Sequence, residues 1–200
     1  MKTKIFVVNG QSGSGKNSFV NYICDYDKKI TGKNRIIHTA LIERVKTIAE
    51  KCGWHGEKTS QARAFLHELT VLLEKYNDLP YQSIVQSIRM NELVCDSNKI
   101  PIKPFLFIDI REPKDIERLK KDFECTTILI KRGESKIYGN AADDDVFNYQ
   151  YDFVIENDRT LEDLKDAAES FWLYFLFEQS RFEWDNTLTL ISPIDFLSEM

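Results

Sequence analysis

Five short runs rich in β-branched and aromatic residues recur along the chain, at residues 4–9, 35–38, 105–110, 126–130 and 152–155. The first run shows no alternation of polar and apolar positions, as expected for a central strand of a parallel sheet with both faces covered. The run at 105–110 is the most hydrophobic of the five. We therefore predict five strands.

Segments in which apolar residues recur every three or four positions separate these runs, which is typical of amphipathic helices. They lie at about 16–26, 41–52, 59–76, from 80 onward, 113–123 and 160–177. Pro80 and Pro113 suit a first helical turn because proline fixes φ near the helical value. Thr160, followed by Asp163, has the spacing of a capping box, which marks the start of the last helix.

Strands and helices alternate along the chain, which predicts an α/β fold with a parallel sheet, right-handed crossovers and a ligand site at the carboxyl ends of the strands. The chain has 200 residues and 42% hydrophobic content, enough for one sizeable core. We expect a single domain over 1–180, with a helical block at about 54–98 and a lid-like loop at about 131–150. The tail at 181–200 shows no clear pattern.

Charge and cysteine spacing exclude several classes of protein. Lys and Arg number 27 against 32 Asp and Glu, a net charge of −5 without a concentrated basic surface, so we expect neither nucleic acid nor a membrane as a partner. No apolar stretch reaches membrane-spanning length, and the first residues lack the pattern of a signal peptide. Cysteines and histidines are scattered without metal-ligand spacing, at Cys24, Cys52, Cys95, Cys125, His38, His55 and His67. We expect a cytoplasmic protein with reduced thiols.

A glycine-rich loop joins the first strand to the first helix. From residue 10 it reads GQSGSGKNS, which matches the Walker A pattern G-x-x-x-x-G-K in the strand–loop–helix context that the pattern requires. The glycines let backbone N–H groups turn toward a phosphate, and Lys16 supplies a charge that bridges the β- and γ-phosphates of ATP. The predicted ATP-binding residues are Gly10, Ser12, Gly13, Ser14, Gly15, Lys16, Asn17 and Ser18.

The metal ligands are less clear, because Asn17 follows Lys16 where the common motif has a Ser or Thr that ligates Mg²⁺. An amide or hydroxyl oxygen suits a hard cation, so Asn17 and Ser18 are both candidate ligands of Mg²⁺ bound with ATP. Asp109 is a third candidate and a predicted catalytic acid, because it ends a buried strand where an acid can meet the metal or the acceptor. An ion pair with Arg111 or a helix-capping role is the alternative for Asp109.

Four arginines are candidates for binding phosphate, since a planar guanidinium binds phosphate oxygens in a bidentate way. Arg111 lies two residues after Asp109, and Arg63 and Arg89 lie in the helical block; all three are predicted to bind the acceptor. A solvated helix face is the alternative for Arg63 and Arg89. Arg132, in the lid candidate, is a predicted catalytic cation that closes over the transferred group.

The order of these segments resembles the nucleoside monophosphate kinase group of P-loop proteins, and most closely its phage and bacterial deoxynucleoside monophosphate kinase-like branch. In that branch Asp and then Ser or Thr often follow the P-loop lysine, so Lys16-Asn17-Ser18 is similar to a variant with Asn for Asp. Residues 58–66 resemble the helix that offers an arginine to the acceptor, here Arg63, and 108–113 resemble the Asp-x-Arg segment. The segment 152–158 is similar to the last strand, which implies that Asn157 lies near the adenine. The resemblance implies the sheet order 2-3-1-4-5.

Three functions fit these observations. The leading hypothesis is an enzyme that moves the γ-phosphoryl group of ATP, bound with Mg²⁺, to a nucleoside or deoxynucleoside monophosphate. The first alternative is a kinase for another small phosphorylated acceptor such as dephospho-coenzyme A. The second is a non-catalytic module that binds nucleotide and regulates. Turnover with an acceptor would separate the enzymes from the module.

Overall fold

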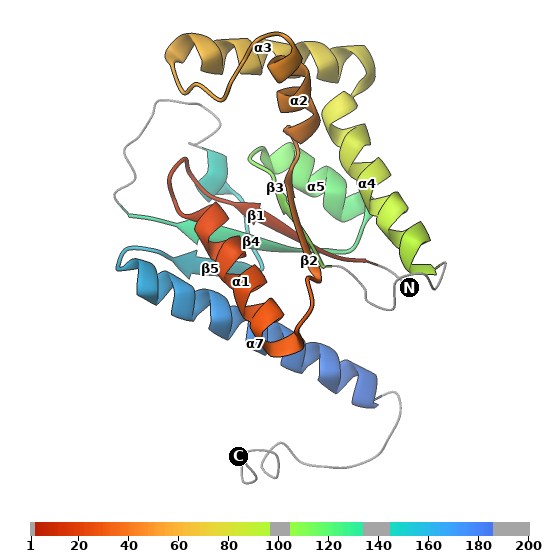
Figure 1. Ribbon diagram of the computed structural model, residues 1–200, viewed down its shortest axis with the longest axis vertical. Helices are drawn as coiled ribbons and strands as arrows, with labels where there is room; N and C mark the ends of the chain where they lie inside the picture. Colours follow the sequence, from red (N-terminus) through yellow and green to blue (C-terminus); the bar gives the residue numbers. More distant parts are fainter. Residues whose placement is uncertain (1–2, 97–104, 134–144, 186–200) are drawn as a thin grey trace.

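Five parallel strands form the centre of the protein, whose computed structural model describes residues 3–96, 105–133 and 145–185. The strands are β1 (Lys4–Asn9), β2 (Ile36–Ala40), β3 (Phe105–Asp109), β4 (Cys125–Lys131) and β5 (Phe153–Glu156). They lie in the order β2-β3-β1-β4-β5, and every pair is parallel (Figure 1). This is the P-loop fold and the strand order that the family resemblance implied, so the prediction of fold class is confirmed.

The helices follow the predicted sequence of elements. They are α1 (Lys16–Thr31), α2 (Glu43–Lys51), α3 (Ser60–Asn77), α4 (Leu79–Asp96), α5 (Pro113–Asp122), the 3-10 helix η1 (Asp145–Asn148) and α7 (Leu161–Asp185). The predicted N-cap of α7 is confirmed: Thr160 Oγ1 accepts a hydrogen bond from the Asp163 amide at 3.2 Å, and the Thr160 amide donates to Asp163 Oδ2 at 3.0 Å. In this capping box, the backbone amide of each residue donates to the side-chain oxygen of the other.

Two helices extend beyond their predicted ends. α1 continues to Thr31 and ends where Gly32 adopts a left-handed φ of 69°. α7 continues to Asp185, past the predicted start of the tail at 181. The last turns of α1 are polar, so the apolar pattern that marks a helix in the sequence stops before the helix does.

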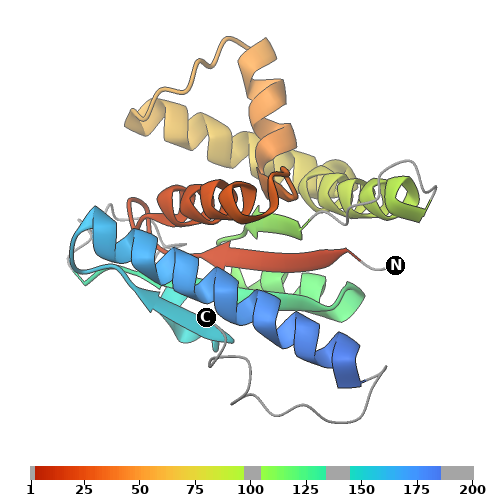
Figure 2. The same ribbon diagram turned by 60° about the horizontal axis from the view of Figure 1, so that its bottom comes forward.

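One face of the sheet is covered by α1 and α7, which lie side by side in Figure 2. Aromatic rings fill this interface: Phe6 stacks on Phe107 with ring centroids 4.5 Å apart, and Phe105 meets Trp172 edge-on at 4.8 Å. Both arrangements are among those that aromatic pairs prefer. Phe19, Ile23 and Trp172 are completely or almost completely buried, which fixes the position of α1 and hence of the loop before it.

The opposite face is covered by α4 and α5. Ile84 and Ile88 of α4 and Ile116 and Leu119 of α5 are buried against the side chains that β1 and β3 present on this side. The helical block predicted at 54–98 therefore has two parts, because α4 belongs to the core. Among the helices that the structure describes, α2 and α3 stand beyond the sheet, at the top of Figure 1, and none of the residues of α3 is buried.

A buried acid, Asp27, links α1 to α7 and to the segment before β2. Asp27 of α1 is 1% exposed; it accepts a hydrogen bond from Arg35 Nε at 3.0 Å and another from Trp172 Nε1 at 2.9 Å. A terminal nitrogen of Arg35 also contacts Asp27 Oδ1, the oxygen that accepts from Trp172. The guanidinium of Arg35 lies 5.2 Å from the ring centroid of Phe105. A buried carboxylate is tolerated only when it is paired and hydrogen-bonded in this way. The network fixes α1 to α7 and to the start of β2.

Some predictions fall partly outside the described residues. Of the lid-like loop at 131–150, the structure describes 131–133 and 145–150, so 134–144 lie outside it. Cys24, Cys52 and Cys125 are free thiols; Cys24 and Cys125 are half-buried, and Cys52 is exposed and so is not a core residue. Among the described residues, no helix combines the length and the hydropathy needed to cross a membrane.

Candidate functional site: the P-loop at the carboxyl end of the sheet

The Walker A loop connects β1 to α1 and is shaped by its glycines. A Cβ on Gly10, at φ 148°, would collide with the carbonyl oxygen of Ile130 and lie 2.6 Å from Ser14 Oγ. A Cβ on Gly15, at φ 100°, would lie 2.6 Å from the side-chain nitrogen of Asn157. Left-handed backbone and close approach both require glycine at these two positions. The loop is therefore packed against β4 and the end of β5.

Lys16 lies across the loop. Its Nζ donates to the carbonyl oxygens of Gly10 at 2.6 Å and Gln11 at 2.9 Å. In the described first turn of α1 there is no acidic side chain, and Gly15 provides no side-chain cap. The N–H groups at this end of the helix therefore keep the partial positive charge that attracts an anion. Lysine and helix terminus together form a cationic end suited to phosphate.

Asn157 fastens the loop to the end of β5. Its side chain is 6% exposed and donates from Nδ2 to the Ser14 carbonyl oxygen at 2.8 Å, while its amide donates to the Lys131 carbonyl oxygen at 2.7 Å. The family resemblance implied a position near the adenine. The structure shows the side-chain amide donating to the backbone of the loop, so Asn157 holds the loop in position. Ser14 Oγ itself is buried and has no hydrogen-bond partner among the described residues.

Asn9 fixes the other end of the loop, a role that the sequence did not reveal. Its Oδ1 accepts from the Gly10 amide at 2.7 Å, and its Nδ2 contacts Tyr151 Oη at 2.7 Å and the Arg111 carbonyl oxygen at 3.0 Å. Tyr151 in turn donates to the Val146 carbonyl oxygen at 2.9 Å, and burial raises the pKa of its hydroxyl to about 12. Asn9 thus joins the P-loop to the turn after β3 and to η1.

Asp109 ends the strand next to β1, which leads into the loop. It ends β3 opposite Val8, the penultimate residue of β1, and its backbone oxygen accepts from the Leu41 amide at 3.0 Å. Its Oδ1 lies 3.2 Å from Nε2 of His38 on β2. Arg111, the partner considered from the sequence, is exposed and makes no ion pair with it in the described part of the chain. The sequence assigned no role to His38, because only the strand order places it next to Asp109.

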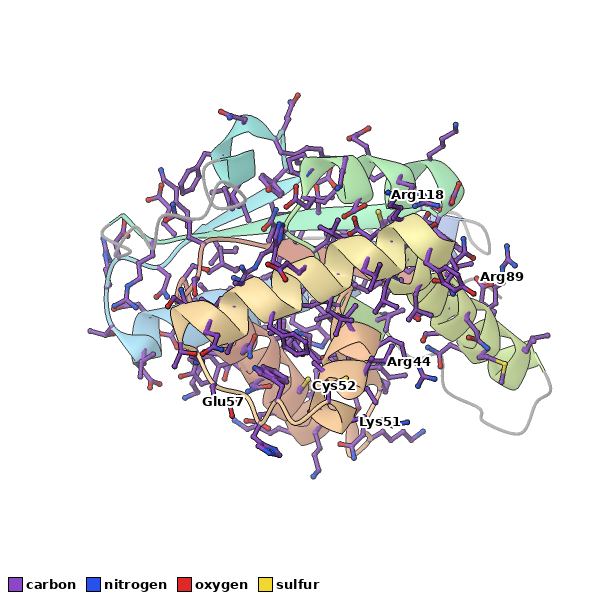
Figure 3. The ribbon with its side chains drawn as sticks, turned by 90° about the horizontal axis from the view of Figure 1, so that it is seen from above. Arg44, Lys51, Cys52, Glu57, Arg89 and Arg118 are labelled. Atoms are coloured by element: carbon purple, nitrogen blue, oxygen red, sulfur yellow. The ribbon has the colours of Figure 1, made fainter. Side chains whose placement is uncertain are left out.

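The structure separates the four candidate arginines. Arg111 and Arg132 are exposed and follow the carboxyl ends of β3 and β4, next to the strand that precedes the P-loop. Arg63 is half-buried in the first turns of α3, the end of that helix that lies on the P-loop side in Figures 1 and 2. Arg89 is exposed in the second half of α4, which runs toward the amino end of β1, and points outward in Figure 3. It is not brought to the P-loop.

The described residues fit a magnesium ion that arrives with a nucleotide. They contain no group of three or more His, Cys, Asp or Glu side chains that could hold a metal alone. Mg²⁺ in nucleotide sites needs only one or two protein oxygens in addition to phosphate and water. Asn17 is exposed and Ser18 half-buried in the first turn of α1, and the Asp109 side chain is 20% exposed. These hard oxygen donors suit Mg²⁺.

Comparisons with known proteins give only distant likenesses. No family model matches the chain, and a search of curated proteins found no match. Among solved structures, a protein from Thermus thermophilus aligns at 17% identity over 87% of this chain and 98% of its own, with a TM-score of 0.48. A sugar kinase from Janibacter aligns at 14% identity (86% and 94% covered, TM-score 0.41), and a thymidylate kinase from Ehrlichia chaffeensis at 15% identity (88% and 100% covered, TM-score 0.40). Identities and TM-scores this low carry no argument about activity.

Proposed function

We propose that this protein is an ATP-dependent phosphotransferase that moves the γ-phosphoryl group to a nucleoside or deoxynucleoside monophosphate. The observation that carries the proposal is the P-loop itself. Its glycines have the required backbone conformations, Lys16 lies over the loop, and Asp109 stands at the end of the adjacent strand. This combination is suited to a nucleoside triphosphate and to little else.

Phosphoryl transfer depends on positioning and on stabilising negative charge, and the residues around the loop supply both. Lys16 leaves the loop carbonyls and pairs with the β- and γ-phosphates, while the backbone N–H groups of the loop bind the remaining oxygens. Asn17 or Ser18, with Asp109 nearby, would hold the Mg²⁺ that comes with ATP, and this ion would neutralise further phosphate charge. The acceptor phosphate oxygen then attacks the γ-phosphorus in line, and ADP leaves.

The acceptor needs its own cations, because two phosphate groups repel each other as they approach. In this proposal the acceptor phosphate is bound by Arg111, which follows β3, and by Arg63, in the first turns of α3. Arg132, which is exposed after β4, would stabilise the transferred group. Arg89 has no part in this proposal, since it lies at the other end of α4.

One observation favours a second candidate function. Asn17 is exposed at the position where the common motif carries a metal-ligating hydroxyl, so a module that binds nucleotide without turnover is the alternative. A kinase for another acceptor, such as dephospho-coenzyme A, would use the same P-loop and differ only in the groups that recognise the acceptor.

The test is ADP production from ATP and Mg²⁺ with a panel of nucleoside monophosphates, deoxynucleoside monophosphates and dephospho-coenzyme A. Lys16→Ala should abolish the activity. Lys29→Ala is the matched control, because Lys29 is exposed in the last turn of the same helix, away from the loop. ADP that depends on an acceptor and disappears only in Lys16→Ala supports the kinase. ATP binding without ADP formation for any acceptor would leave the regulatory module.

A further inference from the structure

A cavity of about 240 Å³ lies apart from the P-loop, between the end of α3, the start of α4 and the first turns of α5. Pocket-lining residues come from four segments: Leu41, Glu74, Asp78, Pro80, Tyr81, Lys114, Asp115 and Arg118. Its volume is below the range typical of sites for drug-sized ligands, so it is suited to a single planar group. The charges around it decide what that group can be.

The wall of the cavity is held by Arg118, which lies beside the end of α3 in Figure 3. Its two terminal nitrogens donate to Asp78 Oδ1 at 2.9 Å and to Asp78 Oδ2 at 2.5 Å, and its guanidinium carbon lies 3.7 Å from the ring centroid of Tyr81. The Tyr81 hydroxyl donates to Asp122 at 2.6 Å. A bidentate ion pair stacked on an aromatic ring is rigid, so the Arg118 guanidinium is held by Asp78 and Tyr81 and is not available to bind a ligand.

Asp115 is the buried acid that faces the cavity. The residue is 9% exposed and lines the cavity, and its oxygens are not among the described side-chain atoms that are both sealed and without a partner, so they reach the cavity itself. The neighbouring Lys114 forms its ion pair with Glu74, with Nζ 4.0 Å from Oε2. Burial raises the pKa of Asp115 to about 6; Glu74 and Glu112 raise it as well, whereas Lys114 and Arg118 lower it. A largely buried acid that opens onto a cavity gains free energy when a hydrogen-bond donor enters the cavity, which makes Asp115 the candidate for binding a ligand there.

We propose that this cavity binds a planar group with two adjacent N–H donors and that the Asp115 carboxylate accepts both. Two parallel N–H···O bonds are the strongest way to satisfy a carboxylate, and they would offset the cost of burying it. The cavity is lined by three carboxylates and two cations, both of which have acidic partners, so a neutral or cationic donor is favoured over an anion.

This chemistry has two possible sources. One is the Watson–Crick edge of guanine, with its ring N–H and exocyclic amino group. Guanine would then be the base of the phosphoryl acceptor, an assignment that rests on the proposed function. The other is a separate small guanidinium compound, which does not depend on that function. The experiment therefore measures binding and turnover separately.

Binding is measured by titration calorimetry on the full chain at pH 8, where Asp115 is ionised, with guanosine, inosine and methylguanidinium as probes. Inosine is the matched ligand because it lacks only the exocyclic amino group. We expect guanosine or methylguanidinium to bind, inosine to bind at least tenfold more weakly than guanosine, and Asp115→Asn to lose at least tenfold of the affinity. Glu117→Gln is the control variant, because Glu117 is an exposed acid on the same helix that does not line the cavity.

The outcomes separate the sources and also separate this proposal from the proposed function. If the wild type binds guanosine more tightly than inosine and Asp115→Asn removes this difference, guanine is the ligand of the cavity. ADP production with GMP but not with IMP would then show that the acceptor is a guanine nucleotide. Methylguanidinium binding through Asp115 without guanosine binding supports the separate compound. Either result stands even if no acceptor is phosphorylated. Absence of binding by both probes, or equal binding by wild type and Asp115→Asn when circular dichroism shows both folded, would overturn the proposal.

Discussion

Asn157 offers the sharpest test of how the proposed nucleotide site is built. The side chain is buried and donates to the Ser14 carbonyl oxygen at 2.8 Å across the base of the P-loop. Asn157→Ala removes this donor, so the buried carbonyl oxygen of Ser14 loses its side-chain hydrogen bond. A buried polar group that loses its partner costs about 1 to 3 kcal/mol. At a factor of ten per 1.4 kcal/mol, this corresponds to about 5- to 150-fold in an equilibrium constant.

Part of this free energy appears as lost stability and part as lost affinity, because a loosened loop has to be ordered again when phosphate binds. We expect ATP to bind about tenfold more weakly, and the free energy of unfolding to fall by about 1 to 2 kcal/mol. Asn34→Ala is the control, since Asn34 is exposed in the turn before β2. The measurements are titration calorimetry and urea unfolding followed by circular dichroism.

The choice of ligands distinguishes the two roles considered for Asn157. ATP, GTP and tripolyphosphate share the phosphates but not the base. If Asn157 positions the loop, Asn157→Ala weakens all three ligands by the same factor. If it reads adenine, as the family resemblance implied, only ATP binding is weakened. A variant that binds tripolyphosphate like the wild type but loses ATP would refute the assignment of Asn157 to the loop.

Three further predictions concern stability. Asp27→Ala leaves the Arg35 guanidinium and the Trp172 N–H without their buried acceptor, so unfolding in urea should show a loss of about 3 to 5 kcal/mol, and a loss under about 1 kcal/mol would contradict the network. Because folding raises the pKa of Asp115 to about 6, its protonated form stabilises the protein fully below about pH 4, and this contribution is lost as the pH rises through 6. After allowance for hydration from the cavity, this contribution to the free energy of unfolding amounts to about 1 to 2 kcal/mol. It is measured by comparing how much the free energy of unfolding changes between pH 4 and pH 8 in the wild type and in Asp115→Asn. Equal changes in the two proteins would show that folding does not shift the pKa of Asp115. Gly10→Ala forces a Cβ against a β4 carbonyl and should cost about 2 to 5 kcal/mol, whereas unchanged unfolding would mean that the loop can shift.

Features that depend on neighbours in the chain could be predicted from the sequence. The Walker A loop needs only its glycines, Lys16 and the flanking strand and helix, and all of them lie within a short segment. The same holds for the cap of α7, where Thr160 and Asp163 are three residues apart and bond to each other. Apolar runs predicted all five strands. β1 and β3 lie in the interior of the sheet and are almost completely buried, whereas the edge strands β2 and β5 are apolar although part of each is exposed. The order of the strands came from resemblance to a family and not from any local pattern.

The tertiary structure alone decided which distant groups meet. Asn157 reaches Ser14 across 143 residues of sequence, Trp172 reaches Asp27 across 145, and His38 reaches Asp109 across 71. No periodicity or spacing reports such contacts, because they form only when parallel strands and their helices bring separate segments to one edge or one face of the sheet. The cavity around Asp115 is of the same kind, since α3, α4 and α5 each contribute part of it. The sequence by itself determined the glycine-rich loop and the elements around it, since those follow from local backbone conformation and hydrophobic pattern. What holds that loop in place, and what lines the second cavity, depended on packing.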